Sequence, residues 1–325
     1  MNIFYLLLTL NFCNSFVLKP KIISTKLYSN DPTLWNILSA NLKDKARDWF
    51  IKRAENKGIN WSEMTKIYKN DDLFLMEYYN QVENKNLTYP EYYKRPFHGY
   101  DKGNLNWLAA YEGEAATLSM AVNYWEGVDP ETTEHWLRYN ITENIINYNI
   151  ENNNIAIKSI LDVGCSMGIS TEYLYNSFPE VEDCNGLDLS PYFISVAKYR
   201  SDNENLPISY YHRNAEEPTI QKKFDLIVCN FILHEVPFEP SKKILNSLSK
   251  MLNPNGLLAV VDLDPTKVQN NLLLSTFRKW AFEVTEPHIY EYYGSNMTQM
   301  LYDEGLKNVQ KIQNDPINSI WIGYK

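Results

Sequence analysis

The chain has 325 residues, of which 44% are hydrophobic, so it is long and apolar enough to fold around a sizeable core. Its formal net charge is −9 and it has no long block of Lys or Arg, so nucleic acid is not expected as a partner. No two of its four cysteines have the spacing of metal ligands, and no metal site is predicted.

Residues 1–30 are predicted to be a targeting presequence. Residues 3–13 form an apolar run of about 11 residues, long enough for a signal peptide but too short to span a bilayer. Residues 16–30 carry lysine and hydroxyl side chains without an acid. This order resembles the bipartite presequence of plastids acquired by secondary endosymbiosis, with the junction at Ser15–Phe16. A secretory signal is the alternative, and no transmembrane span is expected in the mature chain.

Residues 31–154 are predicted to form a helical extension, because apolar residues recur there at helical spacing. Asn104 is expected to cap the third helix, and Gly58 and Gly127 are expected to end the first and the third. Residues 88–103, rich in Tyr, Pro and Gly, are expected to form a loop. The predicted helices are residues 31–58, 62–82, 104–127 and 132–150.

From residue 155 to 325 the pattern changes to short β-branched runs that alternate with helical segments. Alternation of this kind predicts βαβ units, and therefore a parallel sheet covered by helices on both faces. The predicted strands are residues 155–164, 181–190, 208–215, 224–231, 256–264, 307–313 and 319–324. The predicted helices between them are residues 170–177, 191–200, 240–252 and 297–305.

The strongest local signal is the heptapeptide Asp162–Gly168 (DVGCSMG) at the end of the first predicted strand. Gly164 and Gly168 allow a tight turn and a close approach of the backbone to a ligand. In a parallel sheet the ligand lies at the carboxyl ends of the strands, where N–H groups of the following helix face it. The sequence therefore predicts a ligand-binding turn at this point.

Three further strand ends place polar groups at the same edge of the predicted sheet. Asp188 ends the second strand, where a carboxylate can accept both hydroxyls of a ribose. The third strand ends at Asn214–Glu216, where a side-chain amide and a backbone N–H can hydrogen-bond the edge of an adenine. The fourth strand ends at Cys229–Phe231, beneath the expected reacting centre.

Five motifs in series resemble those of class I S-adenosylmethionine (SAM) dependent methyltransferases, specifically the type 11 group that includes quinone C-methyltransferases. They are DVGCSMG, GLDLS, RNAEEP, FDLIVCNFILHEVP and LNPNGLLAVVDLD, within residues 155–265. The resemblance implies an α/β fold with a Rossmann-like, doubly wound sheet of about seven strands, mostly parallel with an antiparallel C-terminal hairpin. It also implies that SAM is the cofactor and methyl transfer the activity.

The resemblance also assigns a cofactor site. The expected cofactor-binding residues are Asp162, Gly164, Cys165, Ser166, Gly168, Asp188, Leu189, Asn214, Ala215, Glu216, Asn230 and Tyr100. The family usually has Asp where Asn214 stands, but an amide oxygen can still accept a hydrogen bond. Residues 96–116 resemble a segment of plant and algal chloroplast methyltransferases of this group. That resemblance places Tyr100, Gly103, Asn104 and Trp107 in a lid over SAM.

His234, just after the fourth strand, is the candidate general base for an acceptor that starts protonated. The alternative is that it caps a helix or packs in the wall of the site. The expected acceptor is a small or lipid-like molecule, such as a quinone or a phenol, methylated on oxygen or carbon. Glu286, Pro287 and His288 are candidates for the acceptor site, because the family often builds that site between the fifth and sixth strands.

Other classes of protein share part of this pattern. Residues 164–168 also match GxSxG, the nucleophile elbow of α/β-hydrolases, with Ser166 as the nucleophile. Asp262 or Asp264 would then be the acid and His288 the base. Against this alternative, an elbow follows several strands, and Ser166 follows the first. A nicotinamide dehydrogenase is disfavoured, because the sequence lacks the GxGxxG fingerprint of dinucleotide-binding proteins. A protein that binds SAM without catalysis is a further alternative.

Overall fold

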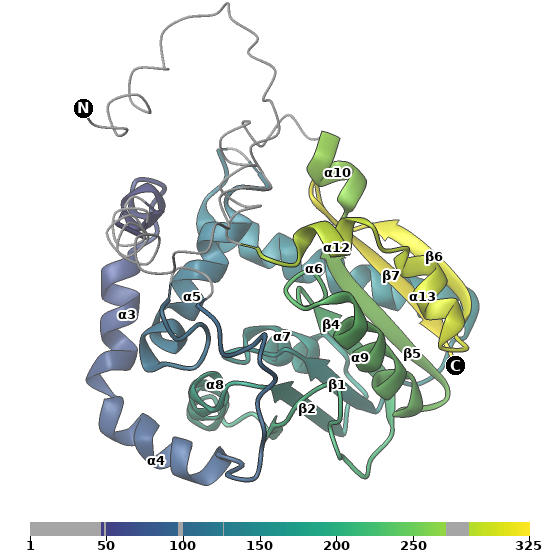
Figure 1. The fold of residues 1–325 in the computed structure, drawn as a ribbon, viewed down its shortest axis with the longest axis horizontal. Helices are drawn as coiled ribbons and strands as arrows, with labels where there is room; N and C mark the ends of the chain where they lie inside the picture. The colour runs from purple at the N-terminus through teal and green to yellow at the C-terminus, as the bar shows by residue number, and fades with distance from the viewer. Residues whose placement is uncertain (1–46, 49, 97–99, 126, 271–285) are drawn as a thin grey trace, which may run out of the picture. The chain divides into compact units, whose positions relative to one another are not determined.

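The computed structural model describes residues 47–48, 50–96, 100–125, 127–270 and 286–325 (Figure 1). The predicted presequence and the start of the first predicted helix, at Asp31 and Pro32, lie outside the described residues. Most of the segment expected to bind the acceptor, residues 271–285, lies outside them as well. Among the helices that are described, none is both long enough and apolar enough to cross a lipid bilayer.

A seven-stranded sheet with the order β3-β2-β1-β4-β5-β7-β6 forms the centre of the fold. The first five strands pair in parallel, and β7 pairs antiparallel with both β5 and β6. The predicted doubly wound sheet with an antiparallel C-terminal hairpin is therefore confirmed. The strands are β1 (Ser159–Val163), β2 (Asp183–Asp188), β3 (Ile208–His212), β4 (Phe224–Asn230), β5 (Leu252–Leu263), β6 (Lys307–Gln313) and β7 (Asn318–Tyr324).

Helices cover both faces of the sheet (Figure 1). Alternate residues of a strand point to opposite faces, so Leu161 and Val163 pack with α9 and α13, whereas Ile160 packs with α6 and α7. Burial of each such side chain stabilises the fold by about 1.5–3 kcal/mol. The helices are α6 (Pro130–Asn152), α7 (Ile169–Ser177), α8 (Pro191–Asn203), α9 (Phe238–Lys250), α10 (Pro265–Asn270), α12 (Ile289–Tyr293) and α13 (Met297–Asp303).

Helices α3 (Trp61–Asn70), α4 (Asp72–Val82) and α5 (Trp107–Ala121) precede α6 and pack onto the sheet domain. Upstream of them, residues 47–48 and 50–55 are helical as well. α4 lies against α8, and α3 lies against α5 (Figure 1). The described residues all belong to one compact unit, Ala46–Lys325. The predicted division at residue 154 stays a prediction.

Two predicted helices differ from the structure. The single helix expected over residues 62–82 is wrong, because the chain leaves helical geometry at Asp71 and forms α3 and α4 instead. The third helix begins at Trp107, and Asn106, not Asn104, caps it by accepting the N–H of Ala109 at 2.9 Å. It ends at Ala121, well before Gly127, where the chain turns away from the helix axis.

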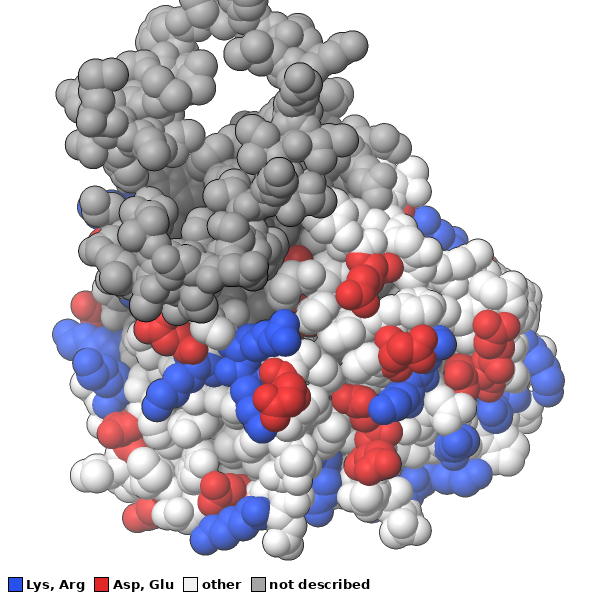
Figure 2. Space-filling view, viewed as in Figure 1, with Lys and Arg blue, Asp and Glu red and all other residues white. Residues whose placement is uncertain are grey.

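Charged side chains of both signs are interspersed over the described residues on the face shown in Figure 2. Several of them form exposed pairs at helical spacing, such as Lys198 with Asp202 at 3.0 Å. Pairs of this kind contribute little to stability, about 0.3–0.5 kcal/mol each. The cofactor site must therefore be sought among buried groups.

Candidate functional site

The predicted ligand-binding turn lies between β1 and α7 and has an unusual backbone. Gly164 and Gly168 have φ values of +70° and +87°, and Ser166 between them has +49°. The N–H groups of Gly164 and Cys165 both donate to the carbonyl oxygen of Leu187, at 2.7 and 3.1 Å. The tight turn predicted from the glycines is confirmed, whereas the left-handed conformation of Ser166 has no signal in the sequence.

Both glycines stand where a side chain would collide with its surroundings. A Cβ atom on Gly164 would lie 2.3 Å from Cδ1 of Ile232. A Cβ atom on Gly168 would lie 3.0 Å from Cβ of Ala197. The turn therefore presents bare backbone at the carboxyl edge of the sheet, where a ligand can approach closely.

Asp188 ends β2 and is tied to this turn. Its carboxylate accepts the N–H of Ser166 at 2.9 Å and the N–H of Ser190 at 2.8 Å. Burial raises the pKa of Asp188 to about 6, and the N–H groups of Ser190, Ser166 and Leu189 counteract this rise. The carboxylate is ionised at neutral pH, as the acceptor of two ribose hydroxyls must be.

Asp162 is fully buried beneath the turn. It accepts the hydroxyl groups of Ser170 at 2.5 Å and Thr171 at 2.8 Å, which fixes the first turn of α7 to the end of β1. Burial raises the pKa of Asp162, and the bonds from Ser170 and Thr171 lower it. The structure thus gives Asp162 a part in shaping the predicted site from below.

Asn230, at the end of β4, lies beside Asp162. Its amide nitrogen is 3.4 Å from Oδ1 of Asp162. Its own Oδ1 atom is buried and accepts no hydrogen bond from the residues that the structure describes. A buried carbonyl oxygen without a donor fits an ammonium group, and the methionine moiety of SAM carries one. Together with the bare turn and Asp188, this atom makes the site fit the cofactor that the sequence implies.

Cys165, a predicted cofactor residue, can offer only its backbone. Its thiol is buried against β2, where a Cβ atom on Gly186 would lie 2.8 Å from its sulfur. Leu189 is half-buried, and its carbonyl oxygen lies 3.1 Å from Nε2 of His212. A contact of either residue with SAM stays a prediction.

At the end of β3, the polar groups that were predicted to bind adenine form hydrogen bonds within the protein. The amide oxygen of Asn214 accepts the N–H of Glu216 at 2.9 Å, so these two predicted adenine-binding groups engage each other. The carboxylate of Glu216 accepts the hydroxyl of Tyr92 at 2.8 Å. Ala215 is half-buried against the core. The adenine-binding role of Asn214, Ala215 and Glu216 stays a prediction.

The predicted lid residues meet α5 and the strand ends. The hydroxyl of Tyr100 donates to the buried carboxylate of Glu112 at 2.6 Å, and Arg47 forms an ion pair with the same carboxylate. The carbonyl oxygen of Asn104 accepts the hydroxyl of Ser190 at 2.7 Å, two residues beyond Asp188. α5 itself runs close to the turn, since a Cβ atom on Gly113 would lie 2.9 Å from the sulfur of Met167.

A tyrosine-rich segment covers the ends of β2 and β3 through contacts with His212. Nδ1 of His212 accepts the N–H of Asn84 at 2.9 Å, and Nε2 lies 3.1 Å from the hydroxyl of Tyr89. Burial lowers the pKa of His212 to about 4. Burial raises the pKa of Tyr93 well above the ordinary value, and the nearby charge of Asp188 raises it further. Tyr is abundant throughout this chain, so no single tyrosine stood out.

His234, the candidate base, forms a buried pair with Asp262 at the end of β5. Nδ1 of His234 lies 2.6 Å from Oδ1 of Asp262. Asp262 is fully buried and also accepts the N–H groups of Leu233 (3.0 Å) and His234 (3.3 Å). Burial lowers the pKa of His234, but the carboxylate of Asp262 outweighs it and raises the pKa to about 9. The sequence analysis named Asp262 only for the hydrolase alternative.

The hydrolase alternative is wrong. Asp262 is bonded to His234, and Asp264 accepts the hydroxyl of Ser319 at 2.8 Å and pairs with Lys311 at 2.9 Å. Both acids thus have partners other than His288, and the ring of His288 lies edge-on to Tyr92. The acceptor-site role of Glu286, Pro287 and His288 stays a prediction.

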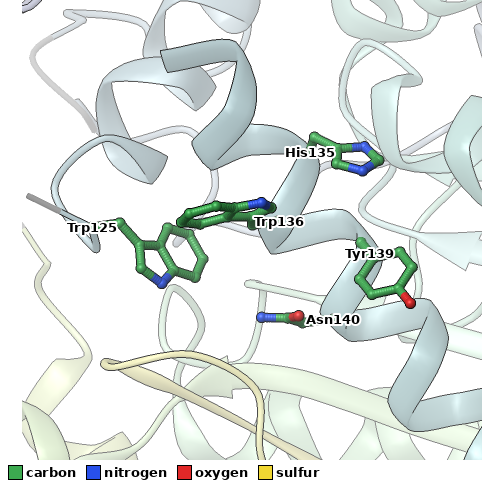
Figure 3. A pocket seen from close by; sticks show the side chains of 5 residues that line it. All are labelled: Trp125, His135, Trp136, Tyr139 and Asn140. Carbon is green, nitrogen blue, oxygen red and sulfur yellow. The ribbon is translucent and has the colours of Figure 1, made fainter. Parts of the chain in front are cut away.

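A cavity of about 430 Å³ opens beside the first half of α6. It is lined by Trp125, His135, Trp136, Tyr139 and Asn140, which face one another in Figure 3. None of the predicted site residues within the described ranges lines this cavity. Because Asp188, the bare turn and His234 all lie at or just beyond the strand ends, we place the candidate functional site there and not in the cavity.

Known proteins resemble this chain over the same region. A family model described as a methyltransferase domain matches residues 134–311, more than half of the chain's 325 residues. A ubiquinone biosynthesis O-methyltransferase of Histophilus somni is 31% identical over 139 residues, 41% of this chain and 52% of that one. The mitochondrial ubiquinone biosynthesis O-methyltransferase of Schizosaccharomyces pombe is 29% identical over 175 residues, 52% and 59% of the two chains. The chain spans about half the length of the curated relatives it matches.

Among solved structures, a SAM-dependent methyltransferase of Clostridium acetobutylicum aligns with 57% of this chain and 91% of its own, with a TM-score of 0.44 and 15% identity. The family model begins inside α6 and ends inside β6, so its match includes the turn, Asp188 and His234. The chain therefore belongs to the family of SAM-dependent methyltransferase domains.

Proposed function

We propose that the protein transfers a methyl group from SAM to a hydroxyl oxygen of a small, phenol-like acceptor, with His234 as the general base. The observation that carries this proposal is the buried pair of His234 and Asp262, whose ring nitrogen and carboxylate oxygen are 2.6 Å apart. A hydroxyl group must lose its proton to become a good nucleophile, so O-methylation needs such a base. Methylation on carbon is the second candidate from the sequence, and this pair favours oxygen.

The acceptor class is supported by the relatives. Two of them are ubiquinone biosynthesis O-methyltransferases, and their matched regions make up 52% and 59% of their chains. A quinol or catechol ring carries phenolic hydroxyl groups whose pKa is close to that of tyrosine, about 10. A base with a pKa of about 9 matches such a hydroxyl far better than an ordinary histidine does.

When bound, SAM supplies a methyl group activated by its sulfonium. The chain has to orient this group and the acceptor, and orientation alone can supply about 7–11 kcal/mol of the barrier. Asp188 and the turn at residues 164–168 hold the cofactor end, and Asp262 fixes the ring of His234. The acceptor's proton moves to Nε2 of His234. The deprotonated acceptor oxygen would then take the methyl group that bound SAM supplies.

Substitution His234→Asn tests the base. We expect kcat with catechol or 3,4-dihydroxybenzoate to fall about 100- to 10,000-fold, because general-base catalysis contributes this much. The dissociation constant for SAM, measured by calorimetry, should stay within about twofold. His135→Asn is the matched control, since His135 lies on α6 beside the aromatic cavity. Unchanged turnover in His234→Asn excludes His234 as the base.

The pH profile gives a second readout of the same residue. His234 acts as a base only when neutral, and its pKa is raised to about 9. The kcat/KM value should therefore rise about tenfold per pH unit below 9 and level off above it. In Asp262→Asn the pKa falls toward the ordinary value of about 6.5, so the rise moves to lower pH. A wild-type plateau that already begins near pH 6.5 contradicts the proposal.

We further propose a plastid location, on the strength of the bipartite pattern in residues 1–30. Residues 1–35 fused to a fluorescent protein should direct it to a plastid bounded by extra membranes, in a host that has one. The same fusion with Phe16 replaced by Ala should lose that location and follow the secretory route. Secretion or cytosolic retention of the unmodified fusion contradicts the proposal.

A further inference from the structure

The cavity beside α6 has no part in the site at the strand ends. Its volume of about 430 Å³ falls within the range of small-molecule pockets, about 300–1,000 Å³. Of the described residues that line it, all but Asn140 carry an aromatic ring. Trp136 and Tyr139 are 38% and 46% exposed. The cavity therefore offers aromatic surface that stays accessible from solvent.

The rings form walls at an angle to one another (Figure 3). The indole planes of Trp125 and Trp136 meet at 84°, with centroids 5.7 Å apart. On the other side, the ring of His135 stacks on that of Tyr139, with centroids 6.0 Å apart. The face of an aromatic ring is electrostatically negative, so ring faces around one space attract a cation. The cation–π contacts between described residues lie elsewhere, at the rings of Tyr78, Phe238 and Trp321.

Polar groups at the cavity are engaged with the protein itself. The amide nitrogen of Asn140 donates to the carbonyl oxygen of Asn314 at 3.0 Å. Nδ1 of His135 lies 3.3 Å from the hydroxyl of Tyr173. A primary ammonium group has three N–H donors that need acceptors, and a sugar has several hydroxyl groups. A quaternary ammonium group has no N–H donor, so it suits a cavity whose free surface is mostly ring faces.

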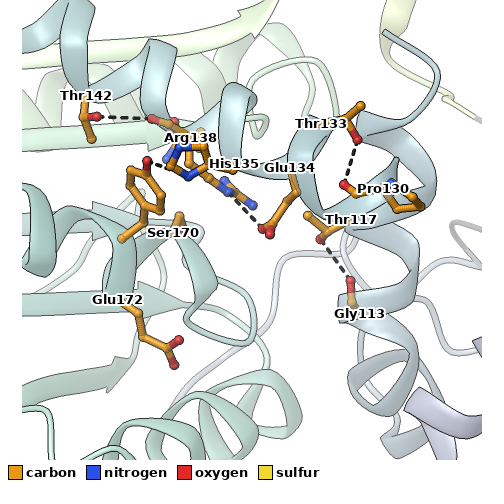
Figure 4. A network of polar contacts seen from close by, with 12 residues as sticks. Gly113, Thr117, Pro130, Thr133, Glu134, His135, Arg138, Thr142, Ser170 and Glu172 are labelled. Carbon is orange, nitrogen blue, oxygen red and sulfur yellow. Dashed lines mark hydrogen bonds and ion pairs between the residues drawn. The ribbon is translucent and has the colours of Figure 1, made fainter. Parts of the chain in front are cut away.

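The charges of α6 also favour a cation. Glu143 lies one helical turn beyond Tyr139, on the same side of the helix. Burial raises the pKa of Tyr173, and the charges of Tyr139, Glu134 and Glu143 raise it further, so both acids lie within electrostatic reach of the cavity's edge. Arg138, the one Arg or Lys in α6, is only 9% exposed and faces Glu134 at 3.6 Å (Figure 4). It balances Glu134 but not Glu143.

We propose that this cavity binds a quaternary ammonium group, such as that of choline, whose methyl groups contact the rings of Trp125, Trp136 and Tyr139. Such a group is weakly hydrated and presents its charge through its methyl groups, so it is the cation that aromatic walls hold best. The cavity is a second binding site, separate from the site of methyl transfer. The quaternary ammonium belongs either to a free molecule or to the head group of a choline lipid.

The first arm of the test compares three small molecules by calorimetry with the full chain. Choline is the probe, 2-aminoethanol has the same skeleton with a primary ammonium, and 3,3-dimethylbutan-1-ol has the shape of choline without its charge. Choline should bind about tenfold or more tightly than either analogue, because only choline combines the charge with the methyl groups. If the neutral analogue binds as tightly as choline, the cavity is merely apolar and the proposal is overturned.

The second arm uses variants whose folding is checked by circular dichroism. Trp136→Leu should weaken choline binding about 5- to 30-fold, and Trp136→Phe should keep most of the affinity, because it keeps a ring face. Tyr139→Leu should also weaken binding. Tyr302→Leu is its matched control, since Tyr302 is 45% exposed, like Tyr139 with 46%, but lies on α13. Choline binding that is unchanged in folded Trp136→Leu and Tyr139→Leu overturns the proposal.

Sedimentation with lipid vesicles distinguishes the two sources of the group. If the ligand is a lipid head group, the wild type sediments with phosphatidylcholine vesicles but not with phosphatidylglycerol vesicles, and Trp136→Leu stays in the supernatant with both. If the ligand is a free molecule, the wild type stays in the supernatant and still binds choline. A wild type that binds neither choline nor phosphatidylcholine vesicles overturns the proposal, whereas the proposed methyl transfer is unaffected by that result.

Discussion

The surroundings of Asp188 and His234 shift their pKa values in ways that suit their proposed roles. Burial raises the pKa of Asp188 to about 6 and prevails over the N–H groups of Ser190, Ser166 and Leu189 that lower it; the pKa is still low enough for ionisation at neutral pH. His234 has the carboxylate of Asp262 at 2.6 Å, so the opposite charge prevails over burial and its pKa rises to about 9. Asp188 is thus ionised at neutral pH, as its proposed contact with the ribose requires. His234 becomes a stronger base, because its pKa is raised.

Asp188 should make SAM binding dependent on pH. Only the ionised carboxylate can accept both ribose hydroxyls, and its pKa in the free protein is about 6. The affinity should be full at pH 8 and fall as the pH drops through 6, because protonation then competes with binding. Calorimetric titrations with SAM between pH 5 and 8 measure this.

Asp188→Asn should weaken SAM binding about 10- to 100-fold and flatten the pH dependence, since it removes a charged acceptor. Asp183→Asn is the matched control at the other end of β2, where the carboxylate pairs with Lys222 on the surface. An Asp188→Asn variant that binds SAM as well as the control contradicts the ribose-binding role.

Sequence reasoning at the residue scale succeeded where the chemistry is local. Asp188 and His234 could be named because one ends β2 and the other follows β4 closely, each in a recognisable pattern. The partnership of His234 with Asp262 joins residues 28 positions apart on neighbouring strands, so no local pattern announces it. Asn84 and Tyr89 reach His212 from a segment that precedes the sheet, and only packing brings them there.

At the scale of elements, the turn between β1 and α7 is the most constrained feature of the fold. It combines two glycines and a serine at positive φ with two hydrogen bonds to the end of β2. The two glycines allow this shape, because glycine reaches such φ values without strain. This is why the glycine spacing predicted the turn correctly.

Gly168→Ala should destabilise the protein by about 2–5 kcal/mol. A left-handed conformation costs an alanine about 1–2 kcal/mol. Crowding against Ala197 of α8, at 3.0 Å, adds about 1–3 kcal/mol. Urea denaturation measures the free energy of unfolding.

Gly58→Ala is the matched control, because Gly58 has a similar φ of +89° but no heavy atom within 4 Å of an added Cβ. It should lose only the conformational part, about 1–2 kcal/mol. If both variants lose the same free energy of unfolding, α8 moves to make room for the added methyl group. That result would contradict the close packing described above.

Element boundaries show where periodicity is insufficient. The strands and helices of the sheet domain were predicted with small shifts, because burial on both faces leaves a strong pattern. The predicted helix over residues 62–82 failed at Asp71, since α3 and α4 pack against different partners, α5 and α8. Apolar spacing continues across that break, and the change of direction is a tertiary effect.

At the scale of the whole molecule, the N-terminal helices and the sheet domain form one unit, Ala46–Lys325. Arg200 of α8 helps to join them, since its guanidinium pairs with Glu172 of α7 at 2.8 Å and with Glu114 of α5 at 3.4 Å. It also donates to the hydroxyl of Tyr68 on α3 at 2.7 Å. Because this network is partly buried, each of its pairs interacts more strongly than it would in water. Side chains of α3, α5 and α7 thus meet at the single side chain of Arg200.

The amino-acid sequence by itself determined the order of strands and helices, the glycine turn, the carboxylate at the end of β2 and the membership in a methyltransferase family. These follow from periodicity and from short motifs, which act over a few neighbouring residues. Only the tertiary structure decided which buried charges meet, as Asp262 does with His234. Such encounters depend on how helices pack onto the sheet, and the strength of a charge depends on the burial that packing creates.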